Sequence, residues 1–137
     1  MAAVFEWDDR YSLNIPEIDA ENRQLVDLVN QAFETLGQDS TGIPNILTRL
    51  REFADAHFSR EVRYMEQTQY PRIAEHNEDH EEFLRNLREF EARKTLDSPL
   101  DLAIRVSLFL REWLQEHLLG EDRKLFVHVG SIPPPKP

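Results

Sequence analysis

Glycine and proline are scarce within four long segments of this chain and cluster at the joints between them and toward the two ends of the chain. Each segment repeats apolar residues at the three- and four-residue spacing of one helix face, and none alternates like a strand. The segments run from about Asp19 to Leu36, from near Pro44 to Tyr70-Pro71, from about Arg72 to Lys94, and from Ser98-Pro99 through His117. The pattern predicts an all-α fold, an antiparallel up-down-up-down four-helix bundle. Asp19 is the expected N-cap of the first helix.

The two ends of the chain lack this helical period. Residues 1–18 contain Trp7, Tyr11 and Pro16, and we expect an extended N-terminal arm that packs its aromatic rings on the bundle. Residues 131–137 are rich in proline and are expected to form a disordered tail. A chain of 137 residues fits one hydrophobic core, so we expect a single domain over residues 1–130.

The composition excludes several classes of protein. The absence of cysteine excludes disulfides, iron–sulfur clusters and thiolate zinc sites. A net charge of −10 argues against binding to nucleic acid. No apolar run approaches the roughly 20 residues of a membrane span, and no segment resembles a signal peptide. We therefore expect a cytoplasmic protein with neither a nucleic acid nor a membrane as its partner.

Two of the predicted helices carry pairs of metal-binding side chains. His57 and Glu61 lie four residues apart, as do His76 and His80, so each pair shares one helix face. Apolar residues surround both pairs, and a histidine or glutamate on such a face costs desolvation energy unless it is paired or bound. Taken alone, the first pair is explained as well by a hydrogen bond across one helical turn, and the second by a surface pair.

The fourth predicted helix carries His117 and Asp122. Five residues separate them, about 140° around a regular α-helix, which is awkward for two ligands of one site. Gly120 between them allows the helix to end or bulge at that point. In an antiparallel bundle the three motifs can meet at one level, and imidazoles with carboxylates suit iron, zinc or manganese. The three motifs together predict a site for two metal ions inside the bundle.

The chain resembles the bacterial hemerythrins, oxygen-binding non-haem di-iron proteins, from about Val4 to Phe126. The matching stretches are Trp7 with Tyr11, Ile15-Pro16-Glu17-Ile18-Asp19, His57-Phe58 with Glu61 and Met65, Tyr70-Pro71 with His76 and His80, and Trp113-Leu114 with His117 and Asp122. The resemblance implies reversible O2 binding by a carrier, a store or a soluble sensor rather than by an enzyme, and we expect a monomer.

The resemblance also implies a role for each residue of the site. His76, His80 and His117 would ligate one iron, and His57 the other. Glu61 and Asp122 would bridge the two irons, together with an oxo or hydroxo group. Leu118 and Trp113 are the apolar side chains expected to line the oxygen pocket and keep water out.

One position departs from the family pattern. The family carries a histidine ligand in an Ile-Asp-x-Gln-His stretch, where this chain has Ile18-Asp19-Ala20-Glu21-Asn22. The second iron site would therefore be more open, and only one metal position would be filled if that iron is lost. The alternatives are a di-iron or mononuclear metalloenzyme that reacts with O2, peroxide or nitric oxide, an iron-donating repair protein, and a structural bundle with a vestigial site. His128, the remaining histidine, is expected at the surface.

Overall fold

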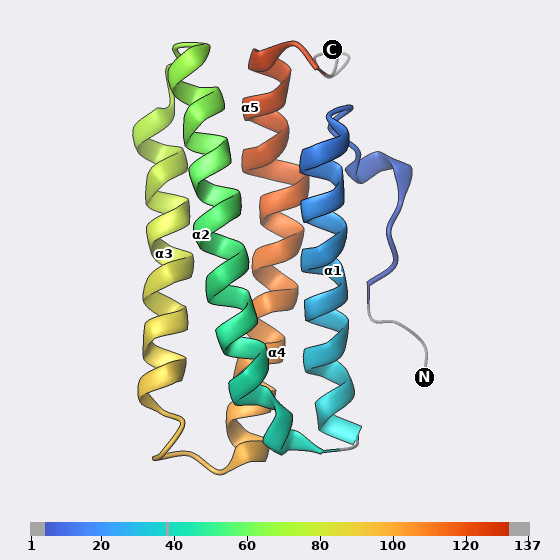
Figure 1. Cartoon of the computed structure of the whole chain (residues 1–137), viewed down its shortest axis with the longest axis vertical. Helices are drawn as coiled ribbons and strands as arrows, with labels where there is room; N and C mark the ends of the chain where they lie inside the picture. Colours follow the sequence, from blue (N-terminus) through green and yellow to red (C-terminus); the bar gives the residue numbers. More distant parts are fainter. Residues whose placement is uncertain (1–4, 38, 132–137) are drawn as a thin grey trace.

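The computed structural model of the chain describes residues 5–37 and 39–131, and these form four long helices side by side (Figure 1). The helices are α1 (Pro16–Gly37), α2 (Ile43–Gln67), α3 (Ile73–Ala92) and α4 (Pro99–Glu116), with the short helix α5 (Asp122–Val129) continuing the line of α4. Successive long helices run in opposite directions, with α1 packed against α2 and α4, and α2 against α3. The predicted all-α, up-down-up-down bundle is confirmed, and the described residues contain no strand.

The ends of the helices follow from local side-chain chemistry. The Ser98 hydroxyl caps α4 by accepting from the Asp101 backbone N–H at 3.1 Å, and Pro99 occupies the first turn. At the start of α1 the prediction is wrong, because the helix begins at Pro16 rather than after Asp19. Asp19 lies in the first turn and reaches back to the arm, where it accepts from the Ser12 hydroxyl at 2.6 Å and the Leu13 N–H at 2.8 Å.

The N-terminal arm packs on the outside of α1. The Asn30 side-chain amide pairs with the backbone of Phe5, accepting from its N–H at 2.9 Å and donating to its carbonyl at 2.8 Å. The Arg23 guanidinium lies 4.8 Å from the centre of the Trp7 ring, a cation–π contact. The expected packing of the aromatic residues is confirmed for the described part of the arm. The arm also contains a short 3-10 helix, η1 (Asp9–Tyr11). A second 3-10 helix, η2 (Ser40–Gly42), lies between α1 and α2.

The core of the bundle is divided into two apolar clusters. The larger fills the half of the bundle that holds Leu47, Phe83 and Leu110, and the smaller surrounds Met65 and Phe126 at the other end. On α2 the larger cluster extends to Phe58 and the smaller includes Met65, and the fully buried His57 and Glu61 lie at this boundary. A layer of polar side chains therefore crosses a bundle that is otherwise packed with hydrocarbon.

A π-helical turn, η3 (His117–Glu121), joins α4 to α5. The three elements form one continuous rod, so the fourth helical segment extends to Val129 and ends at Gly130, whose φ of 91° suits glycine. Beyond it the Ser131 hydroxyl donates to the Phe126 carbonyl at 3.2 Å. The remainder of the expected tail, residues 132–137, lies outside the described residues. In the described part of the chain, no helix is both long enough and apolar enough to span a bilayer.

Candidate metal centre

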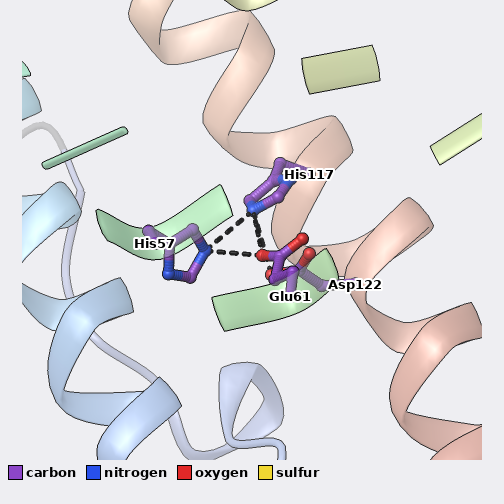
Figure 2. A group of neighbouring side chains, drawn as sticks. All are labelled: His57, Glu61, His117 and Asp122. Atoms are coloured by element: carbon purple, nitrogen blue, oxygen red, sulfur yellow. Dashed lines mark hydrogen bonds and ion pairs between the residues drawn. The ribbon is translucent and has the colours of Figure 1, made fainter. Parts of the chain in front are cut away.

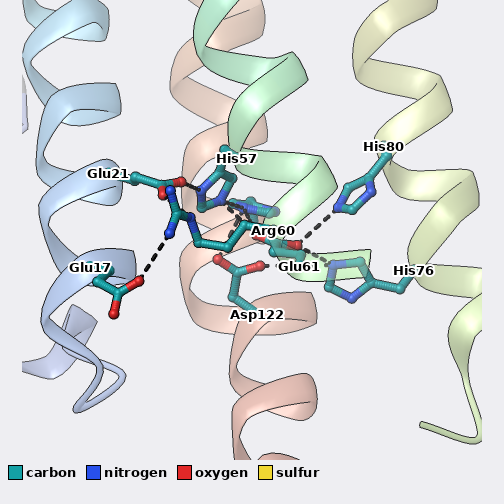
Figure 3. A network of polar contacts seen from close by, with 9 residues as sticks. Glu17, Glu21, His57, Arg60, Glu61, His76, His80 and Asp122 are labelled. Carbon is teal, nitrogen blue, oxygen red and sulfur yellow. Dashed lines mark hydrogen bonds and ion pairs between the residues drawn. The ribbon is translucent and has the colours of Figure 1, made fainter. Parts of the chain in front are cut away.

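The polar layer brings together all six side chains that the sequence singled out as metal ligands (Figures 2 and 3). All six are at least 96% buried: His57 and Glu61 on α2, His76 and His80 on α3, His117 on η3, and Asp122 at the start of α5. They form two groups, His57–Glu61–His117–Asp122 and Glu61–His76–His80, and within each group the potential ligand atoms lie within 4.8 Å of one another.

Glu61 belongs to both groups because its two carboxylate oxygens face different histidines. Oε1 lies 2.6 Å from His57 Nε2 and 3.3 Å from His117 Nε2. Oε2 lies 2.6 Å from His76 Nε2 and 2.9 Å from His80 Nε2. One carboxylate with one oxygen toward each group has the arrangement that a bridging ligand between two metal ions requires.

Asp122 is the second carboxylate at the boundary of the two groups. Its Oδ2 lies 3.0 Å from His117 Nε2 and its Oδ1 lies 4.0 Å from His76 Nε2. His117 Nε2 is also 3.4 Å from His57 Nε2, so its ligand atom faces the group of His57. The sequence-based assignment of His117 to the same iron as His76 and His80 stays a prediction.

The π turn explains how His117 and Asp122 converge despite their five-residue spacing. A π turn holds more residues per turn than an α-helix, and such insertions recur at functional sites. Here it brings Asp122 back to the face that carries His117, at the 3.0 Å separation given above. The bulge expected near Gly120 is therefore present, as a π turn rather than a helix end.

Gly120 itself has no packing reason to be glycine. A Cβ atom at this position would meet no heavy atom within 4 Å, and the backbone φ is not positive. We expect Gly120→Ala to stabilise the protein by about 0.5–1 kcal/mol, because alanine loses less backbone entropy in a helical turn. Thermal unfolding followed by circular dichroism measures this; a lower melting temperature would show that the π turn needs glycine.

The buried charges perturb one another strongly in the metal-free protein. Burial alone lowers the pKa of His57, but the charge of Glu61 and the hydrogen bonds to Glu21 and Glu61 outweigh it and raise the pKa to about 9. Burial likewise opposes ionisation of Glu61, yet the imidazoles of His57 and His117 hold its pKa well below the usual range. The pKa of Asp122 is raised, by burial first and by the charge of Glu61 second. Without a metal, the layer is held together by imidazolium–carboxylate pairs.

These shifts give the metal-free protein a stability that falls as the pH rises. The pKa of His57 is about 9 in the folded protein and 6.5 in the unfolded chain, so its contribution is complete below pH 6.5 and lost by about pH 9. The pKa of His76 and of His117 is raised too, which acts in the same direction. The loss is on the order of 3 kcal/mol. Urea unfolding of chelator-treated protein between pH 6.5 and 9 measures it; constant or rising stability would contradict the proposed ion pairs.

Acidic residues outside the two ligand groups contact two of the histidines, and Figure 3 shows one of these contacts, between Glu21 and His57. Glu21 on α1 accepts a hydrogen bond from His57 Nδ1 at 2.6 Å. Arg60 on α2 forms ion pairs with both Glu21 and Glu17. Asp79 Oδ2 lies 3.6 Å from His117 Nδ1, an ion-pair distance. Such contacts hold the histidine Nδ1, which would leave Nε2 as the nitrogen that binds a metal ion. The sequence alone does not reveal a role for Glu21 or Asp79, because both contacts depend on how neighbouring helices align.

Aromatic rings cover the histidines on the side of the larger core cluster. Phe58 stacks on His80 with ring centres 3.9 Å apart, and Trp113 stacks on His117 at 4.3 Å. Leu118 is fully buried in the same cluster. These contacts place Trp113 beside one of the histidines, and the role of Trp113 and Leu118 in an oxygen pocket stays a prediction.

Asn22 is fully buried on α1, next in sequence to Glu21. Neither its amide nitrogen nor its carbonyl oxygen has a hydrogen-bond partner among the described residues, and an unmet polar group of this kind costs about 1–3 kcal/mol. Helix α1 carries no histidine. His128 belongs to neither group of ligands; its Nε2 lies 2.7 Å from the Thr68 carbonyl at the end of α2, so the expectation of a peripheral histidine is confirmed.

Comparisons with known proteins agree with this geometry. Residues 13–129 match the family described as the Hemerythrin HHE cation binding domain. A bacteriohemerythrin of Clostridium acetobutylicum is 32% identical over 127 residues, covering 88% of this chain and 98% of that protein. A myohemerythrin of Riftia pachyptila is 28% identical, covering 93% of each chain, and one of Sipunculus nudus is 30% identical, covering 88% and 89%.

Proposed function

This chain belongs to the hemerythrin family, and on that premise we propose that it is a non-haem di-iron protein that binds O2 reversibly, as a carrier, a store or a soluble sensor. The position of Glu61 carries the proposal, because its two oxygens face two separate groups of buried imidazoles. A site built for one metal ion has no need of such a central carboxylate.

The residues present fit two iron ions. Four imidazoles and two carboxylates form the mixed nitrogen and oxygen donor set that iron accepts. In the described part of the chain, neither oxygen of the buried Asp122 has a hydrogen-bond partner, although Oδ2 lies 3.0 Å from His117 Nε2. Bound metal ions would satisfy these lone pairs, and ferrous ions would supply the electrons for reversible O2 binding.

The surrounding residues prepare the site for this chemistry. Glu21 holds His57 in one tautomer, and Asp79 lies where it favours the same state of His117. Phe58 and Trp113 stack on His80 and His117 on the side of the larger cluster, and Leu118 is buried in that cluster. Exclusion of water from such a site suppresses side reactions of the bound gas.

Asn22 supports a second candidate function. If it stands where the family carries a histidine ligand, the second iron has fewer protein ligands and more open positions. We hold a metalloenzyme that reacts with O2, peroxide or nitric oxide, or an iron-donating repair protein, as this alternative. The amide of Asn22 favours this alternative, because it is buried and has no hydrogen-bond partner among the residues that the structure describes.

The visible spectrum of the iron-loaded, reduced protein separates these functions. The sample is opened to air and then purged with argon, and iron is counted on the same sample. An absorption band that appears in air and disappears under argon, with two irons per chain, is the result expected for the oxygen binder. A band that never forms, an irreversible conversion to ferric iron, or one metal per chain would replace it with the reactive or mononuclear alternative.

We also propose that the protein acts as a cytoplasmic monomer. All six candidate ligands come from one chain, so a second copy is not needed to complete the site. Light scattering of the iron-loaded protein at several concentrations tests the oligomeric state, and a mass of twice 16.2 kDa would contradict it.

A further inference from the structure

A cavity of about 560 Å³ opens on the surface beside η3, outside the metal centre. It lies against α5, η3 and the start of α3, and its wall includes Tyr70, Arg72, Leu119, Arg123, Lys124 and Val127. Its volume falls within the usual range of small-molecule sites, and most of its lining is apolar. The Tyr70 ring connects it to the metal centre, since its centre lies 6.3 Å from that of the His76 ring.

The charged side chains in this wall are all cationic, in a chain whose net charge is −10. Arg72 and Arg123 form no ion pair with any described residue, and Lys124 Nζ lies 3.2 Å from Glu121 Oε1. The neighbouring cavity, which shares Leu119, is lined by four carboxylates instead. The cationic cavity is therefore a local feature, and it favours an anionic ligand over a neutral or cationic one.

The hydroxyl of Tyr70 is a buried donor without an acceptor. The side chain is 5% exposed, and its Oη has no hydrogen-bond partner in the described part of the chain. A bound anion would accept this hydrogen bond and relieve the cost of leaving the donor unmet.

We propose that this cavity binds a small organic anion, a phosphate or carboxylate attached to a flat apolar body. Arg72 and Arg123 supply planar guanidinium groups that suit such oxyanions, and Tyr70 supplies a further donor. Leu119, 44% exposed, and Val127 supply the apolar wall for the body of the ligand. The proposal does not depend on iron, because none of these side chains is a candidate metal ligand.

Calorimetric titration with 1-naphthyl phosphate tests the site, on both iron-loaded and chelator-treated full-length protein. We expect one molecule per chain in both forms. Inorganic phosphate alone and 1-naphthol alone should bind at least about tenfold more weakly, because each offers only half of the complementary surface. Arg123→Glu should weaken binding about tenfold or more, and Tyr70→Phe about two- to tenfold, the range expected for one charge-assisted and one neutral hydrogen bond.

The matched control is Arg111→Glu, which makes the same change of charge on the exposed face of α4, away from this cavity. It should leave the affinity for 1-naphthyl phosphate within about twofold. No binding at millimolar concentration, equal weakening by Arg111→Glu and Arg123→Glu, or equal affinity for 1-naphthol would overturn the proposal. Circular dichroism of each variant separates loss of binding from loss of fold, and Tyr70→Phe and Arg72→Gln provide milder variants if Arg123→Glu unfolds.

Discussion

Replacing Glu61 with alanine is expected to remove both metal ions and to destabilise the fold. The iron content should fall from two per chain to fewer than about 0.2, because Glu61 is, among the described residues, the one carboxylate in contact with all four candidate histidine ligands. The metal-free variant should lose about 3–5 kcal/mol, since the buried imidazoles lose the partner that sustains their charge. Iron analysis after gel filtration and urea unfolding of the chelator-treated protein measure the two effects separately.

Two controls show what the loss at Glu61 means. Glu66→Ala changes an exposed carboxylate on the same helix, and it should retain iron and change stability by less than about 0.5 kcal/mol. Glu61→Gln keeps the shape of the side chain and removes its charge, so it should lose iron with a smaller loss of stability. If Glu61→Ala keeps two irons per chain, Glu61 is not a bridging ligand.

Asn22→His is expected to tighten the second metal site and to slow oxidation of the iron. An imidazole at this position would add a nitrogen ligand to the group of His57, and the affinity for the second iron should rise by about tenfold or more. The change also removes a buried amide that has no partner. Iron retained during dialysis against a chelator measures the affinity, and the decay of the oxygenated spectrum in air measures the rate of oxidation.

Asn22→Leu distinguishes a new ligand from improved packing. Leucine has the branching and the number of side-chain heavy atoms of asparagine but no polar atom, so it should stabilise the metal-free protein by about 1–3 kcal/mol without tightening iron binding. An equal gain in iron retention from histidine and from leucine would mean that packing, not ligation, limits the site. No gain from histidine would mean that residue 22 does not face the second iron.

The sequence predicted which histidines and carboxylates the fold brings together, because His57 with Glu61 and His76 with His80 are local patterns. The spacing of His57 with Glu61 and of His76 with His80 is set by one helix, and regular helices formed at both places. The sequence-based prediction placed the start of α1 at Asp19, three residues after its actual start at Pro16. Asp19 accepts hydrogen bonds from the N-terminal arm instead of capping the helix. An aspartate can accept hydrogen bonds either as a helix N-cap or from a neighbouring segment, and residue type alone does not distinguish the two roles.

Contacts between different helices could not be predicted from the sequence patterns. The bond from His57 to Glu21 depends on the relative heights of α1 and α2, and 36 residues separate the two side chains. The cationic cavity requires the ends of three elements to meet around Tyr70. Hydrophobic periodicity fixes which face of each helix is buried but leaves the sliding of one helix along another undetermined.

The π turn sets the rotation of all the side chains that follow it, both that of Asp122 at the metal site and those in the smaller apolar cluster. Each residue of a helix advances by about 100°, so deleting Leu119 would rotate every later side chain by that angle. Asp122 would then point away from the histidines, and Leu125 and Phe126 would point away from the smaller apolar cluster. A deletion in this turn therefore disturbs both the metal site and the smaller apolar cluster. Any change in the length of the turn would affect metal binding and folding together.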